Sequence, residues 1–210
     1  MPSDRLNEAL ERFYKLQAEL EAEIDRLLQE KREQFQYHLD RGKVRFEQGM
    51  RALHKRKRIG AWSYLRHARL GHVLSAPLSY SVFFPLLALD IIASTYQHIC
   101  FRIYAIPLVR RSDHIAIDRQ NLAYLNVIEK FNCMYCGYGS GVIEYVREIT
   151  ARTEQYWCPI KHARRTRDPH HLTDHFLDYG DADAWCEKLE ALRKDWSTIE
   201  PVALPDKPEK

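Results

Sequence analysis

The sequence lacks an apolar run near its N-terminus, and it has few cysteines. Residues 1–40 are too highly charged to contain the hydrophobic region of a secretory signal peptide. The five cysteines, an odd number, are therefore expected to be reduced thiols facing the cytosol and not a disulfide framework. No internal repeat is evident, and no segment has the clean apolar–polar alternation of a half-buried strand. These absences favour a mainly α fold.

A long amphipathic helix is predicted within residues 1–58. Asp4 can cap its start. A coiled-coil-like stripe of roughly three heptads follows, formed by Leu6, Leu10, Phe13, Leu20, Ile24 and Leu27. The pattern loosens after Glu30, but apolar residues keep a helical spacing as far as Leu53. The helix either pairs with another helix of this chain or serves as an arm for homo-oligomerisation or for a protein partner.

The overall charge of +3 hides a strongly basic segment. Between Arg41 and Arg69 there are ten Lys or Arg residues and one acidic residue, Glu47, which gives +9. The run Lys55–Arg58 precedes a helical repeat of apolar residues that includes Trp62. This combination is typical of a helix in the headgroup layer of an anionic membrane. Nucleic acid is the alternative partner, and it ranks lower because the basic block directly precedes an apolar segment.

The apolar segment lies within residues 59–109, predicted to be a basic interfacial helix followed by a membrane segment. From Ala76 to Phe101 the only formally charged residue is Asp90. About 20 apolar residues suffice to cross a bilayer. Asp90 would be costly at membrane depth unless it faces protein or water, so it marks a candidate functional position. Prolines within and after the segment make a kinked, re-entrant or in-plane helix a rival to a span, and a buried core helix is the soluble alternative.

The orientation is set only weakly, because both flanks of the segment are basic. A hairpin with both ends in the cytoplasm satisfies both flanks and keeps the thiols reduced. The predicted location is therefore the cytoplasmic face of a membrane.

Residues 110–200 are predicted to form a small helical domain containing cysteine and histidine. A short helix is expected to end before Asn132, and a turn is expected at Gly137, Gly139 and Gly141. A helix ending near Trp157 and a last helix over about 183–196 complete the domain. Residues 201–210 are predicted to be a disordered tail.

Four residues of this domain form the candidate site. Cys133 and Cys136 are separated by two residues, and His162 follows Cys158 with three residues between them. Such Cys3His sets suit one tetrahedral zinc or iron ion. The alternative is a thiol enzyme in which Cys133 and Cys136 form a dithiol couple and His162 is the general base. Glu144, Glu148 and Glu154 are expected to form a solvated face or to support the cluster through hydrogen bonds. His171 and His175, four residues apart, could together bind a metal, but a solvent-exposed polar surface is the favoured interpretation.

Two resemblances accompany this pattern. The run from Asn132-Cys133-Met-Tyr-Cys136 to Arg152-Thr-Glu-Gln-Tyr-Trp-Cys158-Pro-Ile-Lys-His162 resembles an uncharacterised bacterial membrane-associated family. This resemblance implies that the expected location is the cytoplasmic face of a bacterial inner membrane. Locally the run is similar to carboxymuconolactone decarboxylase and alkylhydroperoxidase-D-like proteins, although Ser140 stands where that family has a histidine. The residues together favour a membrane-associated metal-binding protein with an adaptor, assembly or electron-transfer role. A thiol-dependent oxidoreductase at the membrane surface is the alternative.

Overall fold

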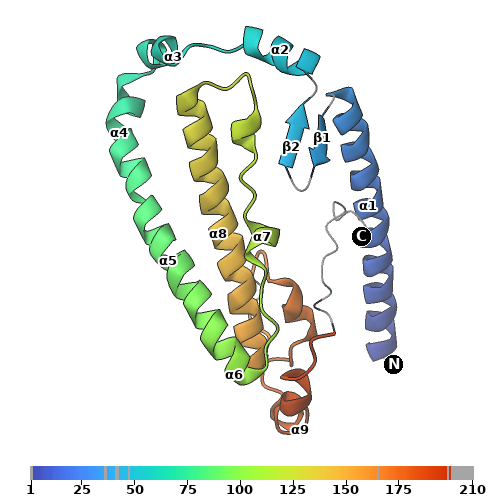
Figure 1. The fold of residues 1–210 in the computed structure, drawn as a ribbon. Helices are drawn as coiled ribbons and strands as arrows, with labels where there is room; N and C mark the ends of the chain where they lie inside the picture. Colours follow the sequence, from blue (N-terminus) through green and yellow to red (C-terminus); the bar gives the residue numbers. More distant parts are fainter. Residues whose placement is uncertain are drawn as a thin grey trace. The chain divides into compact units, whose positions relative to one another are not determined.

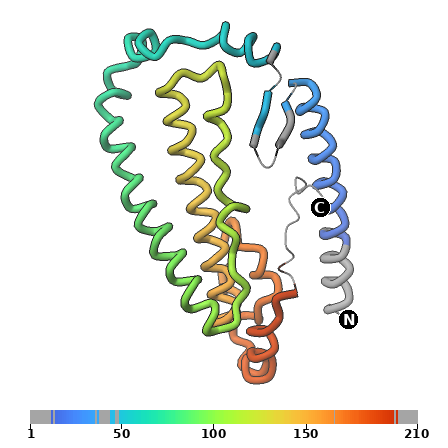
Figure 2. Tube along the Cα trace, in the orientation of Figure 1, coloured from blue at the N-terminus to red at the C-terminus, as the bar shows by residue number. Residues whose placement is uncertain are grey.

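The computed structural model describes residues 2–35, 37–40, 43–46, 48–164, 166–197 and 199. The tail predicted at 201–210 lies outside these residues. The described chain is mainly helical, which confirms the predicted fold class. It divides into two units (Figures 1 and 2), one formed by the described part of residues 1–58 with 121–124, the other by residues 59–120 and those from 125 onward.

The first unit contains the predicted long helix and an unexpected hairpin. Helix α1 spans Pro2–Gln34. Strand β1 (Tyr37–Asp40) pairs antiparallel with β2 (Lys43–Phe46), and helix α2 covers Gln48–Arg56. The expected continuation of helical spacing towards Leu53 is therefore wrong over the hairpin. The missed signal is Gly42, a turn-forming residue type between two short runs.

The second unit begins with α3 (Ala61–His67) and one long apolar helix. Its consecutive parts are α4 (Leu70–Ser81), α5 (Phe83–Tyr96), a π-helical turn (Gln97–Phe101) and α6 (Arg102–Tyr104). Residues Leu70–Tyr104 are long and apolar enough to cross a membrane by length and composition. Only 11 % of the most apolar window of this helix is buried against the rest of the chain, whereas a soluble core helix would be mostly buried.

The chain then runs back along the long helix before α8 begins. Ala105 adopts a left-handed conformation with φ 57° and ends α6. The return segment, residues 105–126, contains α7 (Arg111–His114) and a 3-10 turn (Arg119–Asn121). Helix α8 (Val127–Trp157) then runs in the same direction as α5, beside it (Figure 1). A capping box starts α8, in which the Asn126 side chain accepts from two backbone N–H groups and Glu129 bonds back to the Asn126 N–H.

The predicted helix end before Asn132 and the predicted turn at the three glycines are both wrong, because α8 passes through these positions unbroken. A Cβ added to Gly141 would lie 2.7 Å from Ile115 Cα and 2.8 Å from the His114 oxygen. One at Gly137 would lie 3.0 Å from the Ala116 oxygen. These glycines let the backbone of the return segment approach α8 closely, at a spacing of four residues that places both on one helix face.

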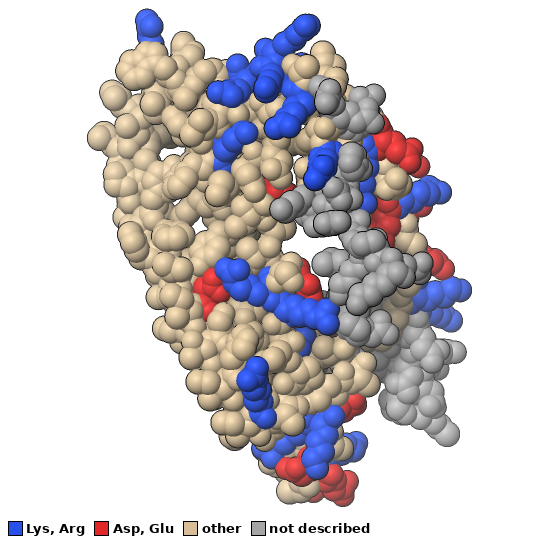
Figure 3. Space-filling model, viewed as in Figure 1, with Lys and Arg blue, Asp and Glu red and all other residues tan. Residues whose placement is uncertain are grey.

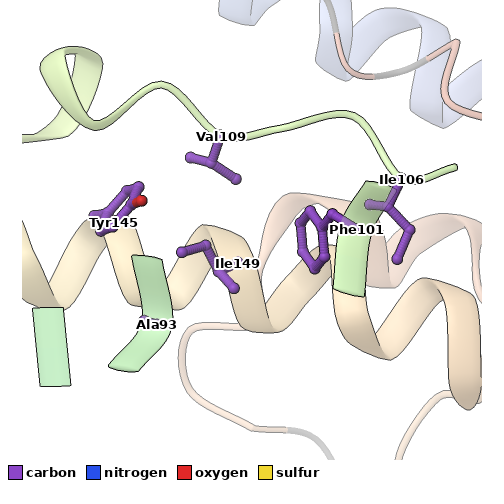
Figure 4. Packing of buried hydrophobic residues seen from close by; sticks show 6 residues of the cluster. All are labelled: Ala93, Phe101, Ile106, Val109, Tyr145 and Ile149. Atoms are coloured by element: carbon purple, nitrogen blue, oxygen red, sulfur yellow. The ribbon is translucent and has the colours of Figure 1, made fainter. Parts of the chain in front are cut away.

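The core of this unit joins the long helix, the return segment and α8. Ala93, Phe101, Ile106, Val109, Tyr145 and Ile149 form a buried cluster (Figure 4). Beyond α8 lie a 3-10 turn (His171–His175) and α9 (Ala182–Leu192). The helix predicted to end near Trp157 does so, whereas α9 ends four residues before the predicted position 196.

Candidate functional site

The four predicted metal ligands lie at two ends of α8. Cys133 and Cys136 occupy one turn of its first third, and Cys158 is its C-terminal cap. Cys158 lies 22 positions after Cys136, which corresponds to about 33 Å at 1.5 Å per residue. Ligands of one zinc ion each lie within about 2.3 Å of the metal. The continuous helix therefore keeps Cys158 and His162 away from the Cys133–Cys136 pair.

No group of three or more metal-binding side chains gathers anywhere in the part of the chain that the structure describes. Two of the four residues nevertheless remain together. Cys133 is half-buried and Cys136 is exposed, three positions apart on α8, so both thiols belong to adjacent positions of one helix surface. At the other end, burial and the Glu154 carboxylate raise the pKa of Cys158, which makes this thiol a weaker nucleophile at neutral pH.

The side chain of Asp90, the charged residue within the apolar segment, faces the return segment and α8. Its carboxylate accepts hydrogen bonds from Arg111 Nε (3.2 Å) and Nη2 (2.7 Å). The Tyr138 hydroxyl of α8 donates at 3.0 Å, and the Ser94 hydroxyl lies at 3.4 Å. The hydrogen bond from Arg111 holds the pKa of Asp90 below its ordinary value against the opposing effect of burial. The carboxylate is therefore charged at neutral pH and paired with a cation.

Further hydrogen bonds follow this contact along the side of the long helix that faces the return segment and α8. The Gln97 amide bonds both backbone groups of Val109, accepting from its N–H at 3.0 Å and donating to its oxygen at 3.3 Å. Gln97 also donates to the Tyr145 hydroxyl, which lies 3.2 Å from Ser94 Oγ. The polar residues Asp90, Ser94 and Gln97 thus all bond to the return segment or to α8. These bonds determine which side of the long helix faces the rest of the unit.

The opposite side of this helix is the most distinctive surface of the unit. At 100° per residue, Leu74 and Ile92 share one face, about opposite Asp90, and exposed Ile103 continues the apolar surface after the π-helical turn. We call this surface the outer face. Its side chains are large, apolar and exposed, and comprise Leu70, Leu74, Leu78, Ile92, Ile99 and Ile103, with exposed fractions between 57 and 80 %. No Lys, Arg, Asp or Glu other than Asp90 lies between Arg69 and Arg102. Figure 3 accordingly shows an uninterrupted uncharged flank over α4 and α5.

Two carboxylate–imidazole pairs join α8 to the segment that follows it. His171 Nε2 lies 2.9 Å from Glu148, and His170 Nε2 lies 2.9 Å from Glu154. Glu148 also accepts from Arg152 Nη2 at 2.7 Å. Burial raises the pKa of Glu148, but the hydrogen bonds from His171 and Arg152 outweigh it and bring the pKa to about 2. Glu148 is therefore part of an internal contact and not of the expected solvated surface, which does include the exposed Glu144.

Comparisons with protein-family models, with curated proteins and with solved structures find no match to this chain. The resemblances to the uncharacterised bacterial family and to the alkylhydroperoxidase-D-like proteins stay predictions.

Several residues that shape the site were not anticipated. Arg111, Tyr138 and Tyr145 lie 21, 48 and 55 positions after Asp90, and no local periodicity links them to it. The available signal was the cost of an isolated buried carboxylate, which requires a cationic partner somewhere in the chain. The four-residue spacing of Gly137 and Gly141 was a second signal, because it is typical of a close helix contact as well as of a turn.

Proposed function

We propose that this protein is a membrane-attached adaptor whose outer face binds the surface of an anionic lipid bilayer. The observation that carries the proposal is the side-chain arrangement of Leu70–Tyr104, whose charged residue faces protein while its exposed side is apolar. Fully burying one leucine or isoleucine is favourable by about 1.5–3 kcal/mol. Six such exposed side chains on one helix face form a large apolar surface without a partner in the described chain.

The hydroxyl groups on this helix support lipid as the partner. Thr95 donates to the Ile91 oxygen at 2.8 Å, Ser81 to the Leu78 oxygen at 2.7 Å, and Ser75 to the His72 oxygen at 3.2 Å. The hydroxyl groups of Thr95, Ser81 and Ser75 therefore each have an acceptor in the helix itself. In hydrocarbon, where water is absent, every polar group needs such an internal partner.

The distribution of charge supports an anionic surface. Exposed Arg66 and Arg69 stand just before the outer face, and exposed Trp62 lies in the preceding helix. In the sequence, Lys55–Arg58 come directly before this unit. Lys and Arg near a membrane contribute roughly 1 kcal/mol each through attraction to anionic headgroups, and tryptophan favours the headgroup layer.

Helix α1 would supply the adaptor function by pairing with a second copy of itself. Leu20, Ile24 and Leu27 continue the predicted heptad stripe, and all three are between 45 and 61 % exposed. Such a stripe is the usual seam of a coiled coil. Light scattering on the full chain tests this role: the Leu20→Lys variant should be monomeric at concentrations where the wild type is a dimer, and a monomeric wild type would contradict it.

Vesicle flotation tests the membrane attachment. The full chain should float with vesicles of 70 % phosphatidylcholine and 30 % phosphatidylglycerol, and bind at least tenfold less to pure phosphatidylcholine. Leu74→Glu and Leu78→Glu should each reduce binding at least tenfold. Ile117→Glu is the matched control, because Ile117 is an exposed apolar residue of the return segment, 41 % exposed. Equal binding by all three variants, or retention on DNA with no binding to vesicles, would refute the proposal.

Metal or thiol chemistry is a second candidate function. It would rest on Cys133 and Cys136, because these two of the four predicted ligands share one helical turn near the start of α8. The pair supplies two ligands towards a zinc or iron ion, or the two thiols of a redox couple. Elemental analysis with free-thiol counting separates the two: stoichiometric metal with both thiols protected favours the ion, and a disulfide without metal favours the couple.

A further inference from the structure

We infer that the helix Leu70–Tyr104 lies in the plane of the bilayer surface and does not cross it. This inference rests on the proposed membrane attachment and specifies its geometry. Length and composition alone permit a span, so the deciding observations concern the elements packed against the helix.

The return segment would enter the hydrocarbon if the helix stood upright. It is bonded along the long helix, through Arg111 to Asp90 and through Val109 to Gln97. Its backbone is largely irregular, and its charged residues are exposed, namely Arg110, Arg111, Asp113, Asp118 and Arg119. Irregular backbone and exposed charge at membrane depth are tolerated only when buried in protein or lining water. An upright helix would place both against lipid.

Helix α8 leads to the same conclusion. It runs beside the long helix, with Ser94 against Tyr145 and the Tyr96 hydroxyl 3.2 Å from Thr153 Oγ1. At this level α8 carries exposed Glu144, and Arg147 is partly exposed. At this level the exposed charged side chains therefore lie on α8 and the return segment, whereas the outer face of the long helix carries none. An interfacial helix, which buries only its apolar side about 5–10 Å into the boundary of headgroups and chains, matches this distribution.

The dimensions of the outer face agree with an in-plane position. The 35 residues of the helix correspond to about 52 Å, whereas the hydrocarbon core is about 30 Å thick. Exposed arginines stand near both ends of the outer face, Arg69 directly before Leu70 and Arg102 directly before Ile103. In an in-plane helix both arginines reach the headgroups of the same leaflet, and no part of the outer face extends into water.

Spin-label depth measurements test the inference. Three full-length variants each carry a ketone-bearing amino acid at one position of the outer face, namely Leu74, Ile92 or Ile103. A nitroxide is attached to the ketone, so the labelling does not require any change to the cysteines. Immersion depth is measured by electron paramagnetic resonance in the phosphatidylcholine–phosphatidylglycerol vesicles. Each variant is first required to bind vesicles like the wild type, and a label that prevents binding is moved to exposed Leu78 or Ile99.

In-plane docking predicts equal depths at the three positions, to within about 5 Å, all near 5–10 Å below the phosphates. A crossing helix predicts Ile92 near the bilayer centre and the labels at Leu74 and Ile103 near opposite surfaces, because Ile103 lies 29 positions after Leu74. That result would overturn the inference while leaving membrane attachment intact. Absence of vesicle binding, with the labels buried in a dimer of this chain, would overturn both.

Discussion

Arg111 donates two hydrogen bonds to the Asp90 carboxylate, from Nη2 at 2.7 Å to one oxygen and from Nε at 3.2 Å to the other. The pair joins the return segment to the long apolar helix, and the Tyr138 hydroxyl adds α8 to the same contact. Asp90 is only 7 % exposed, so its charge does not interrupt the apolar surface of the long helix. Its carboxylate instead joins this helix to the return segment and to α8. This junction keeps the outer face free of charge.

Removal of the arginine should destabilise the second unit. Arg111→Gln leaves the Asp90 carboxylate buried without its cation. Breaking a fully buried pair costs about 3–5 kcal/mol, and the partial exposure of Arg111, 49 %, lowers the expected loss to about 2 kcal/mol. Urea unfolding followed by circular dichroism measures it. The double variant Asp90→Asn/Arg111→Gln should recover more than half of the loss, and Arg110→Gln, at the exposed neighbouring position, should change stability by less than about 0.5 kcal/mol.

Substituting a larger residue for a glycine of α8 should destabilise the protein where the return segment passes close to the helix. In Gly141→Ala, the new Cβ would meet backbone atoms of His114 and Ile115 within 2.9 Å, so the segment must move, at a cost of about 1–3 kcal/mol. Gly71→Ala is the matched control in α4, because nothing lies within 4 Å of its Cβ position. It should be neutral or stabilising by up to about 1 kcal/mol. Equal unfolding midpoints for the two variants would contradict the close approach.

Acid should weaken the contact between α8 and the segment containing His171. The pKa of Glu148 falls from 4.5 to about 2 on folding, so its contribution is complete above pH 4.5 and disappears as the pH falls towards 2. At about 1.4 kcal/mol per pH unit, the full contribution is on the order of 3 kcal/mol. The stability advantage of the wild type over Glu148→Gln, measured by urea unfolding at pH 6, 4 and 3, should shrink in that order.

Glu144→Gln provides the control for this pH dependence, because Glu144 lies one turn earlier on α8 with its side chain 58 % exposed. Its stability should follow that of the wild type at all three pH values. A constant difference between Glu148→Gln and the wild type would show that the Glu148 carboxylate is not held in its charged form.

The two ends of α8 should behave independently towards metal. Because about 33 Å of helix separates Cys136 from Cys158, Cys158→Ser should leave the zinc affinity and thiol protection of the Cys133–Cys136 pair within twofold of the wild-type values. Cys136→Ser should lower both by at least tenfold if the pair binds zinc. Competition titration with a chromogenic chelator measures the affinities. Comparable losses in both variants would instead support one site with four ligands.

The sequence by itself determined the helical class, the long helix α1, the apolar segment and the end of α8 at Trp157, because periodicity, length and Pro159 act locally along the chain. It also indicated that Asp90 needed a special environment. It did not determine the path between Gly137 and Gly141, since glycine serves a turn and a close helix contact equally well, and only the position of residues 114–116 distinguishes the two.

Tertiary structure decided which residues meet. The pairing of Asp90 with Arg111 and Tyr138 depends on the chain reversing at Ala105 and returning alongside α5. The separation of Cys133 and Cys136 from Cys158 and His162 depends on the unbroken course of α8. The physical reason is the same in both cases: residue spacing fixes which side chains share a helix face, whereas contacts between distant segments are fixed by how those faces pack together.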